Sequence, residues 1–208
     1  MTPDCVSLEH VLSGKCPFCF ATGLSKREYL CVLVNLASSL LQLHGTPWLS
    51  ENWNNECVHF WHPANEEELY VAVKFATPPA TEKRCDSFTP NPYLVALGII
   101  FLELSQKKLF SGWLKTRNWD LPEEVMNRAN YAIAWLKEAF NQGKIDRSYA
   151  TIVQRCLTSA FDPVVCSNSL EDEELREAVY HKILEPLKKE YLIAKNKLTI
   201  IKGVDYVL

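Results

Sequence analysis

The fold of this chain is decided by the stretch Ser25-Lys-Arg-Glu-Tyr-Leu-Cys-Val-Leu-Val-Asn-Leu-Ala-Ser-Ser-Leu-Leu-Gln-Leu-His44. Ser25 with Glu28 three residues later is the pattern of a capping box, in which two side chains satisfy the first free N–H groups of a helix. Apolar residues then recur at spacings of three and four, and others occupy much of the opposite side, so the helix is predicted to be buried on most faces. It should end near His44-Gly45, because Pro47 cannot continue a helix.

Outward from this helix, the sequence predicts one β-hairpin and four more helices. Runs 57–61 and 69–75 are rich in β-branched and aromatic residues and flank a polar loop, which is typical of a hairpin. Residues 92–107 are nearly all apolar and predict a helix at the centre of the domain. The remaining helices are expected at 120–143, at 148–157 and from 169 onward, the last broken or kinked at Pro186.

Composition bounds the class of protein. The 208 residues are 48% hydrophobic with a net charge of -3, which suits a single domain over 1–208, with an N-terminal segment at 1–24 and a strand-like tail at 196–208. No broad basic field is present, so nucleic-acid and anionic-membrane partners are not expected. The N-terminus lacks the features of a signal peptide, and the apolar run 94–104 is too short for a membrane span. A cytoplasmic location is therefore expected.

The eight cysteines are expected to be reduced, and one spacing raises the question of a metal. Cys16-Pro-Phe-Cys19 could offer two thiolates to zinc or carry out redox chemistry. The second pair of ligands for a tetrahedral zinc site could come from Cys57, His59 and His62, with Cys57 and His59 on one face of the predicted strand. The 37-residue gap between the two halves is not a recurrent zinc spacing. Ordinary structural thiols are therefore the favoured interpretation, zinc is a weak alternative, and no cofactor is expected.

Two other patterns have unremarkable interpretations. Val71-Ala-Val-Lys74 matches the strand of protein kinases whose lysine grips ATP, but no glycine-rich phosphate loop occurs anywhere in the chain. An alternating strand with a solvent-exposed Lys74 is the simpler interpretation.

Trp113 and Trp119 enclose two basic residues and could form a short groove on which nucleic-acid bases stack. This is a weak alternative.

The order of segments resembles the C-terminal lobe of a protein kinase. Residues 7–12 resemble the segment after the kinase hinge, 40–44 the helix leading into the catalytic loop, and 97–104 the central helix. In this alignment the H-R-D triplet would be Ser50-Glu51-Asn52, the metal-binding Asn would be Cys57, and D-F-G would be Thr77-Pro78-Pro79. The resemblance implies a mainly α, kinase C-lobe-like fold with one small β-hairpin, no N-lobe and no kinase activity, since the required carboxylates are missing.

A closer resemblance is to an uncharacterised fungal domain family with a degenerate, pseudokinase-like fold, over roughly residues 6–192. It is carried by Leu36-Ala-Ser-Ser-Leu-Leu-Gln-Leu-His-Gly-Thr-Pro-Trp48, by Asn91-Pro-Tyr-Leu-Val-Ala-Leu-Gly-Ile-Ile, and by Cys156-Leu with Leu184-Glu-Pro-Leu187. Members of that family often follow other domains in longer proteins linked to fungal self-recognition or signalling. The Cys-Pro-Phe-Cys insert and the strand-like tail depart from the family pattern.

Two functions follow as expectations. The first is a non-catalytic interaction module that binds a protein partner or a second copy of itself, because loss of the N-lobe would expose apolar surface. Its expected contact residues are Trp48, Trp53, Phe88 and Tyr93. The second is a small-molecule enzyme or ligand binder in the vacated cleft, with Cys57 as a nucleophile or Glu51 as an acid/base. Its expected polar residues are Glu51, Asn52, Cys57, His59 and Lys74.

Overall fold

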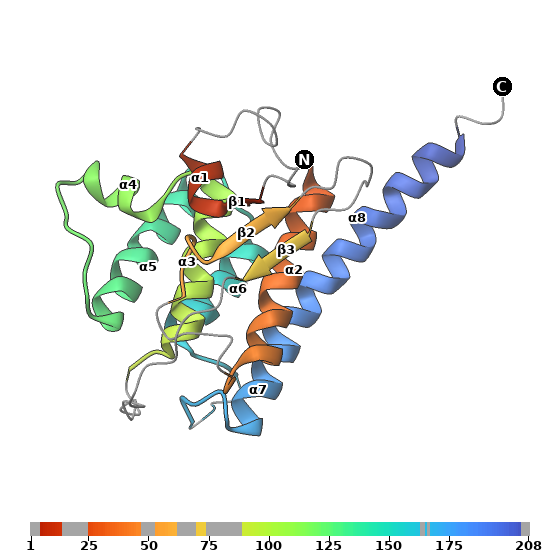
Figure 1. The fold of residues 1–208 in the computed structure, drawn as a ribbon. Coiled ribbons are helices and arrows are strands. Elements are labelled where there is room, and N and C mark those ends of the chain that lie inside the picture. The colour runs from red at the N-terminus through yellow and green to blue at the C-terminus, as the bar shows by residue number, and fades with distance from the viewer. Residues whose placement is uncertain are drawn as a thin grey trace.

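The computed structural model describes residues 5–13, 25–46, 53–61, 70–73, 89–162, 165 and 167–204. The fold is mainly helical, as predicted, with one small antiparallel sheet (Figure 1). In chain order the elements are β1 (Cys5–Ser7), α1 (Leu8–Leu12), α2 (Lys26–Leu43), β2 (Val58–Trp61), β3 (Tyr70–Val73), α3 (Pro92–Gln106), α4 (Phe110–Lys115), α5 (Val125–Asn141), α6 (Arg147–Thr158), α7 (Glu173–Val179), the π-helical turn η1 (Tyr180–Leu184) and α8 (Glu185–Val204).

Helix α3 is the centre of the described fold. Nine of its residues are buried, and it contacts α2, α4, α5 and α6. Its start is fixed by Asn91, whose side chain accepts hydrogen bonds from the N–H groups of Tyr93 and Leu94 and donates one to the Asn168 carbonyl. Because Asn91 is itself buried, this cap also ties α3 to the segment that precedes α7. The predicted central helix is confirmed.

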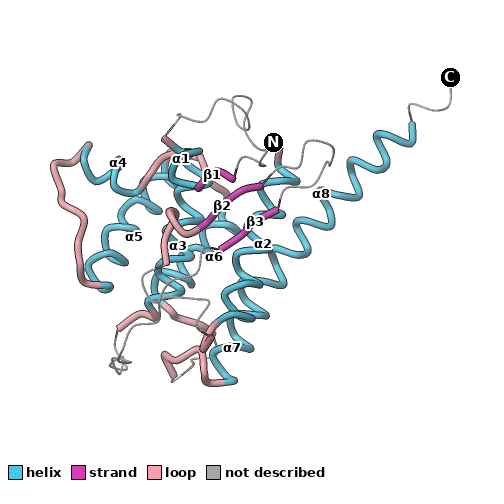
Figure 2. The backbone as a smooth tube through the Cα atoms, viewed as in Figure 1, coloured by secondary structure: helices cyan, strands magenta, loops and turns pink. Residues whose placement is uncertain are grey.

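Helix α2 packs against α8, and α8 then continues past the N-terminal end of α2 (Figure 2). The capping box at the start of α2 is present in both directions: Ser25 Oγ accepts from the Glu28 N–H, and the Glu28 carboxylate accepts from the Ser25 N–H. Gly45, with φ +73°, follows the helix end. The prediction for this helix, with its start and its end, is therefore confirmed.

The predicted hairpin is confirmed as β2 and β3, which pair antiparallel with Val58 opposite Val73. A third strand, β1, adds to the other side of β2 with Ser7 opposite His59, and no pattern in the sequence predicted it. Within the described ranges, no helix is both long and apolar enough to cross a bilayer.

Two sequence predictions about the helices after α4 were wrong. The tail was expected to be a strand, yet residues 196–204 are helical and belong to α8. The helix expected from residue 120 begins instead at Val125, with Glu124 at its N-cap and no side-chain cap. Near Pro186, where a break or kink was predicted, the α-helix is interrupted by the π-turn η1, after which the helical backbone continues.

The backbone carbonyl of Lys182, in the π-turn, accepts a hydrogen bond from a side chain. Pro186 has no N–H, so the Lys182 carbonyl four residues earlier lacks its ordinary helical donor. Arg155 of α6 supplies a replacement, because its Nη1 donates to the Lys182 carbonyl at 3.1 Å. Arg155 therefore fastens α6 to the turn between α7 and α8.

Replacing Arg155 by Met should lower the free energy of unfolding by about 1–2 kcal/mol, because a hydrogen bond from a charged donor is lost while the side-chain stem is kept. Urea denaturation followed by circular dichroism measures this loss. In a Pro186→Ala background the new N–H can bond the Lys182 carbonyl, so the same substitution should cost less. An equal loss in both backgrounds would contradict the role given to Arg155.

Candidate functional site

Eight of the residues predicted for a site lie outside the described ranges. They are Cys16, Cys19, Trp48, Glu51, Asn52, His62, Lys74 and Phe88. The structure therefore places only four of the predicted residues: Trp53, Cys57, His59 and Tyr93.

Trp53 does not lie on an exposed surface, as the interaction hypothesis expected. Its side chain is 3% exposed and belongs to the main hydrophobic core. Tyr93 is half-buried, and its ring meets the His44 ring edge-on with centroids 5.1 Å apart. A Trp ring gains free energy when it leaves water, so the Trp53 side chain packs into the core. Its ring is therefore not exposed for contact with a binding partner.

Cys57 and His59 flank the buried Val58 at the start of β2. Cys57 is a half-buried free thiol that packs against the core, and the His59 Nε2 is buried with no hydrogen-bond partner in the described part of the chain. Among the described residues, no three His, Cys, Asp or Glu side chains gather as a group able to hold a metal ion. The two cysteines of the zinc alternative lie outside those residues.

The carboxylate of Glu103 is buried at the end of α3, where the sequence suggested only an interruption of an apolar run. Its two oxygens accept from Asn55 Nδ2 at 2.8 and 2.9 Å, and Oε1 also accepts from the Phe110 N–H at 2.8 Å. Burial raises the pKa of Glu103 from 4.5 to about 7, against the opposing effect of these hydrogen bonds. Glu103 thus connects the segment before β2 with α3 and the start of α4.

A hollow of about 1050 Å³ lies between α1, α2, α3, α6 and α8, and we call it the cationic groove. These elements are distant in sequence, and the groove forms where the first turns of α2 and α6 meet the last turn of α3. Its lining is mostly apolar and includes the aliphatic residues Leu8, Leu12, Leu30, Leu104, Ile152 and Leu187.

Five basic side chains border this apolar lining. On the side formed by α2 and α8, Lys26 lies 4.0 Å from Glu190, and Lys189 lies 3.2 Å from Glu185. On the side formed by α3 and α6 stand Lys107, Lys144 and Arg147, all exposed. These three make no ion pair within the residues that the structure describes.

Tyr29 and Tyr149 also line the groove, and their hydroxyl groups carry no charge. The Tyr149 hydroxyl donates to the Phe101 carbonyl at 2.8 Å. The Tyr29 hydroxyl is buried and makes no hydrogen bond of ordinary geometry in the described chain, although the Tyr149 hydroxyl is near. Burial raises the pKa of both hydroxyls above the usual value of 10.0, so both stay neutral at physiological pH.

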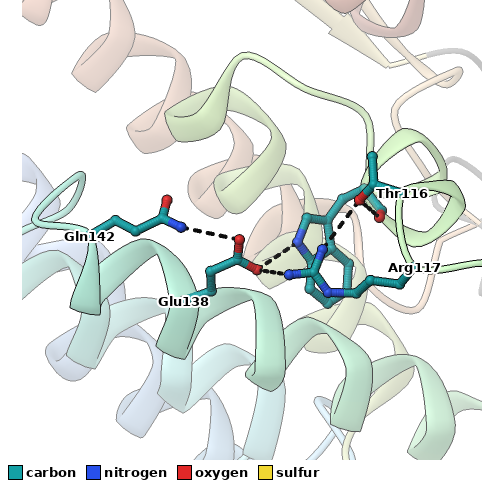
Figure 3. A network of polar contacts seen from close by, with 5 residues as sticks. Thr116, Arg117, Glu138 and Gln142 are labelled. Carbon is teal, nitrogen blue, oxygen red and sulfur yellow. Dashed lines mark hydrogen bonds and ion pairs between the residues drawn. The ribbon is translucent and has the colours of Figure 1, made fainter.

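The pair Trp113 and Trp119 does not form the base-stacking groove that the sequence left open. Trp113 is 3% exposed, and its indole N–H donates to Glu138 at 3.0 Å. The Arg117 guanidinium lies 4.4 Å from the centre of the Trp113 ring and pairs with Glu138, to which Gln142 also donates (Figure 3). These basic and aromatic groups bind one another, and they hold α4 against α5.

Comparison with known proteins yields one match. No curated protein and no solved structure matches the chain. The sequence model of a family described as a domain of unknown function, DUF7580, matches residues 4–192. That description assigns no activity, fold relationship or organism. Since the match spans most of its length, the chain belongs to the DUF7580 domain family.

Proposed function

We propose that this domain is a non-catalytic protein-interaction module and that the cationic groove is its binding surface. The observation that carries the proposal is the apolar lining of a hollow of about 1050 Å³, bordered by exposed cations. Covering apolar surface is the main favourable term in most protein association. A hollow between helices with few polar groups also has the general form of a binding site.

The proposal includes a kinase C-lobe-like architecture without kinase chemistry. In support, the element order runs from a short helix through a long helix and a hairpin to a buried central helix, and then to further helices. Phosphoryl transfer needs carboxylates to orient the hydroxyl and hold magnesium. In the resemblance, Asn52, Cys57 and Thr77 stand at the positions of the catalytic Asp and the metal ligands. A role in fungal signalling or self-recognition rests on the resemblance alone.

A selection from an unbiased library of displayed peptides tests the interaction module. The full chain is the bait, and the groove variant Leu12→Glu places a charge on the half-buried apolar lining. The matched control is Leu121→Glu, because Leu121 is 59% exposed and lies outside the groove. Selected peptides should bind the parent chain and the control, and should lose most of their affinity for the groove variant.

Failure to enrich any peptide would contradict the module, and so would peptides that bind the groove variant as well as the parent. Circular dichroism melts of both variants establish that they remain folded. A loss of binding by a folded Leu12→Glu variant can then be assigned to the groove itself.

A further inference from the structure

We infer that the cationic groove binds an acidic amphipathic helix of a partner protein. This inference rests on the proposed function and adds the chemistry of the partner.

The charge around the groove is opposite in sign to the net charge of the chain. The whole chain carries -3, whereas the groove is bordered by five basic residues and by the acidic residues Asp146 and Glu190, with Glu185 paired to Lys189 beside it. Asp146 is occupied as the N-cap of α6, where it accepts from the Tyr149 N–H at 2.8 Å. The excess positive charge therefore attracts an anionic partner to this one face.

Two of the basic residues stand where a helix alone would disfavour them. Arg147 is the first residue of α6, and Lys26 is the first residue of α2. The N-terminus of a helix carries a partial positive charge, so a cation there lowers helix stability. Both ends face the groove. Lys26 and Arg147 thus each lower the stability of the helix that they begin, and both border the same groove. Such a loss of helix stability is expected where a residue is present for binding and not for folding.

The arrangement of the cations favours a helix over a single-headed anionic lipid. Lys107, Lys144 and Arg147 border one side without an ion pair in the described chain, while Lys26 and Lys189 on the other side are paired with Glu190 and Glu185. One carboxylate headgroup would meet only one of the three unpaired cations. An amphipathic helix that lays its apolar stripe on the groove lining can carry several acidic residues along the edge that faces these three cations, and so meets all of them.

A defined peptide pair tests the inference. The probe is a synthetic helical peptide of about 16 residues, with leucines at i, i+3, i+4 and i+7 and glutamates along one edge of the stripe. Its partner carries lysine in place of each glutamate. Fluorescence anisotropy with the full chain should show at least about tenfold tighter binding of the glutamate peptide. Raising the salt from about 50 to about 300 mM should weaken that binding.

Two charge-reversal variants locate the interaction. Lys144→Glu should weaken binding of the glutamate peptide by about tenfold. Lys137→Glu is the matched control, because Lys137 is also an exposed lysine but lies on α5 outside the groove, and it should change little. Equal losses in the two variants would overturn the inference, because the attraction would then be nonspecific.

Other outcomes separate this inference from the proposed function. Equal binding of both peptides, lost in Leu12→Glu, would overturn the acidic partner and leave the interaction module standing. Binding of neither peptide would overturn the inference, and the peptide selection would still decide the module independently. Binding only to phosphatidylserine vesicles, abolished by Lys144→Glu, would overturn a protein partner in favour of a membrane.

Discussion

Replacing Glu103 by Ala should lower the free energy of unfolding by about 3–5 kcal/mol. The substitution removes the acceptor of the buried Phe110 N–H and of the Asn55 amide, and it leaves a cavity at the end of α3. Each buried donor left without a partner costs about 1–3 kcal/mol, and the cavity adds to this loss. Urea denaturation measured by circular dichroism gives the difference directly.

Glu103→Gln is the control, because it keeps the volume and one carbonyl acceptor for the Phe110 N–H. Asn55 can turn its amide to accept from the new Gln amide, so the loss should stay near 1 kcal/mol at a pH where Glu103 is protonated. Equal losses in the Ala and Gln variants would show that the hydrogen bonds of Glu103 do not support the fold.

The same residue should make stability depend on pH. Because the pKa of Glu103 is raised from 4.5 to about 7 in the fold, the folded chain keeps a proton that the unfolded chain releases between these values. Stability contributed by this group therefore falls as pH rises through this window, by about 3 kcal/mol in total, and is constant above it. Relative to Glu103→Gln, the parent should lose this amount between pH 4.5 and 7. A difference that does not change with pH would contradict the burial of a titrating carboxyl.

Replacing Gly98 by Val should lower the free energy of unfolding by about 3 kcal/mol or more. A Cβ at this position would lie 2.8 Å from Leu157 Cδ2 and 3.0 Å from Cys156 Cβ. Both of these side chains are fully buried in α6, so neither can move toward solvent. Overpacking of this kind typically costs about 1–3 kcal/mol, and a branched side chain adds further clashes. Thermal and urea denaturation measure the loss.

Two further variants test the cause of this loss. Gly112→Ala in α4 is the matched control, since the nearest atom to its new Cβ lies at 3.8 Å, and it should be neutral or stabilising by up to about 1 kcal/mol. Combining Gly98→Ala with Leu157→Ala should cost less than the sum of the two single losses, because each removes part of the other's misfit. Simple additivity would show that α3 and α6 do not meet closely at Gly98.

The helices that the sequence predicted well are those whose signals are local. Helix α2 carries its cap and its apolar spacing within one stretch, and α3 has too many apolar residues to lie anywhere but inside. The segment 196–208 was predicted to be strand-like because Thr199, Ile200 and Ile201 favour a β-strand in isolation. Their backbone is helical because it continues a helix that is already anchored on the core.

The groove could not be predicted from sequence, because its lining comes from five elements spread from α1 to α8. Taken singly, Lys107 and Lys144 are ordinary basic residues after helix ends, where the dipole favours them. Lys26 and Arg147, each the first residue of a helix, were the two unusual signals. Trp53 was predicted to be an exposed contact residue because it lies in a loop, but its side chain is buried in the core.

The π-turn between α7 and α8 has a consequence for comparing members of this family. Leu175, Val179, Ile183 and Leu187 are spaced by four and all buried. In a regular α-helix, residues spaced by four drift around the helix axis, by roughly 120° between Leu175 and Leu187. A π-turn accommodates one extra residue and so cancels most of this drift, which keeps the four side chains on one face. A relative without that residue would have an ordinary helix there. Its sequence should align with a single-residue gap near 180–185, and every groove position of α8 beyond the gap would be numbered one lower.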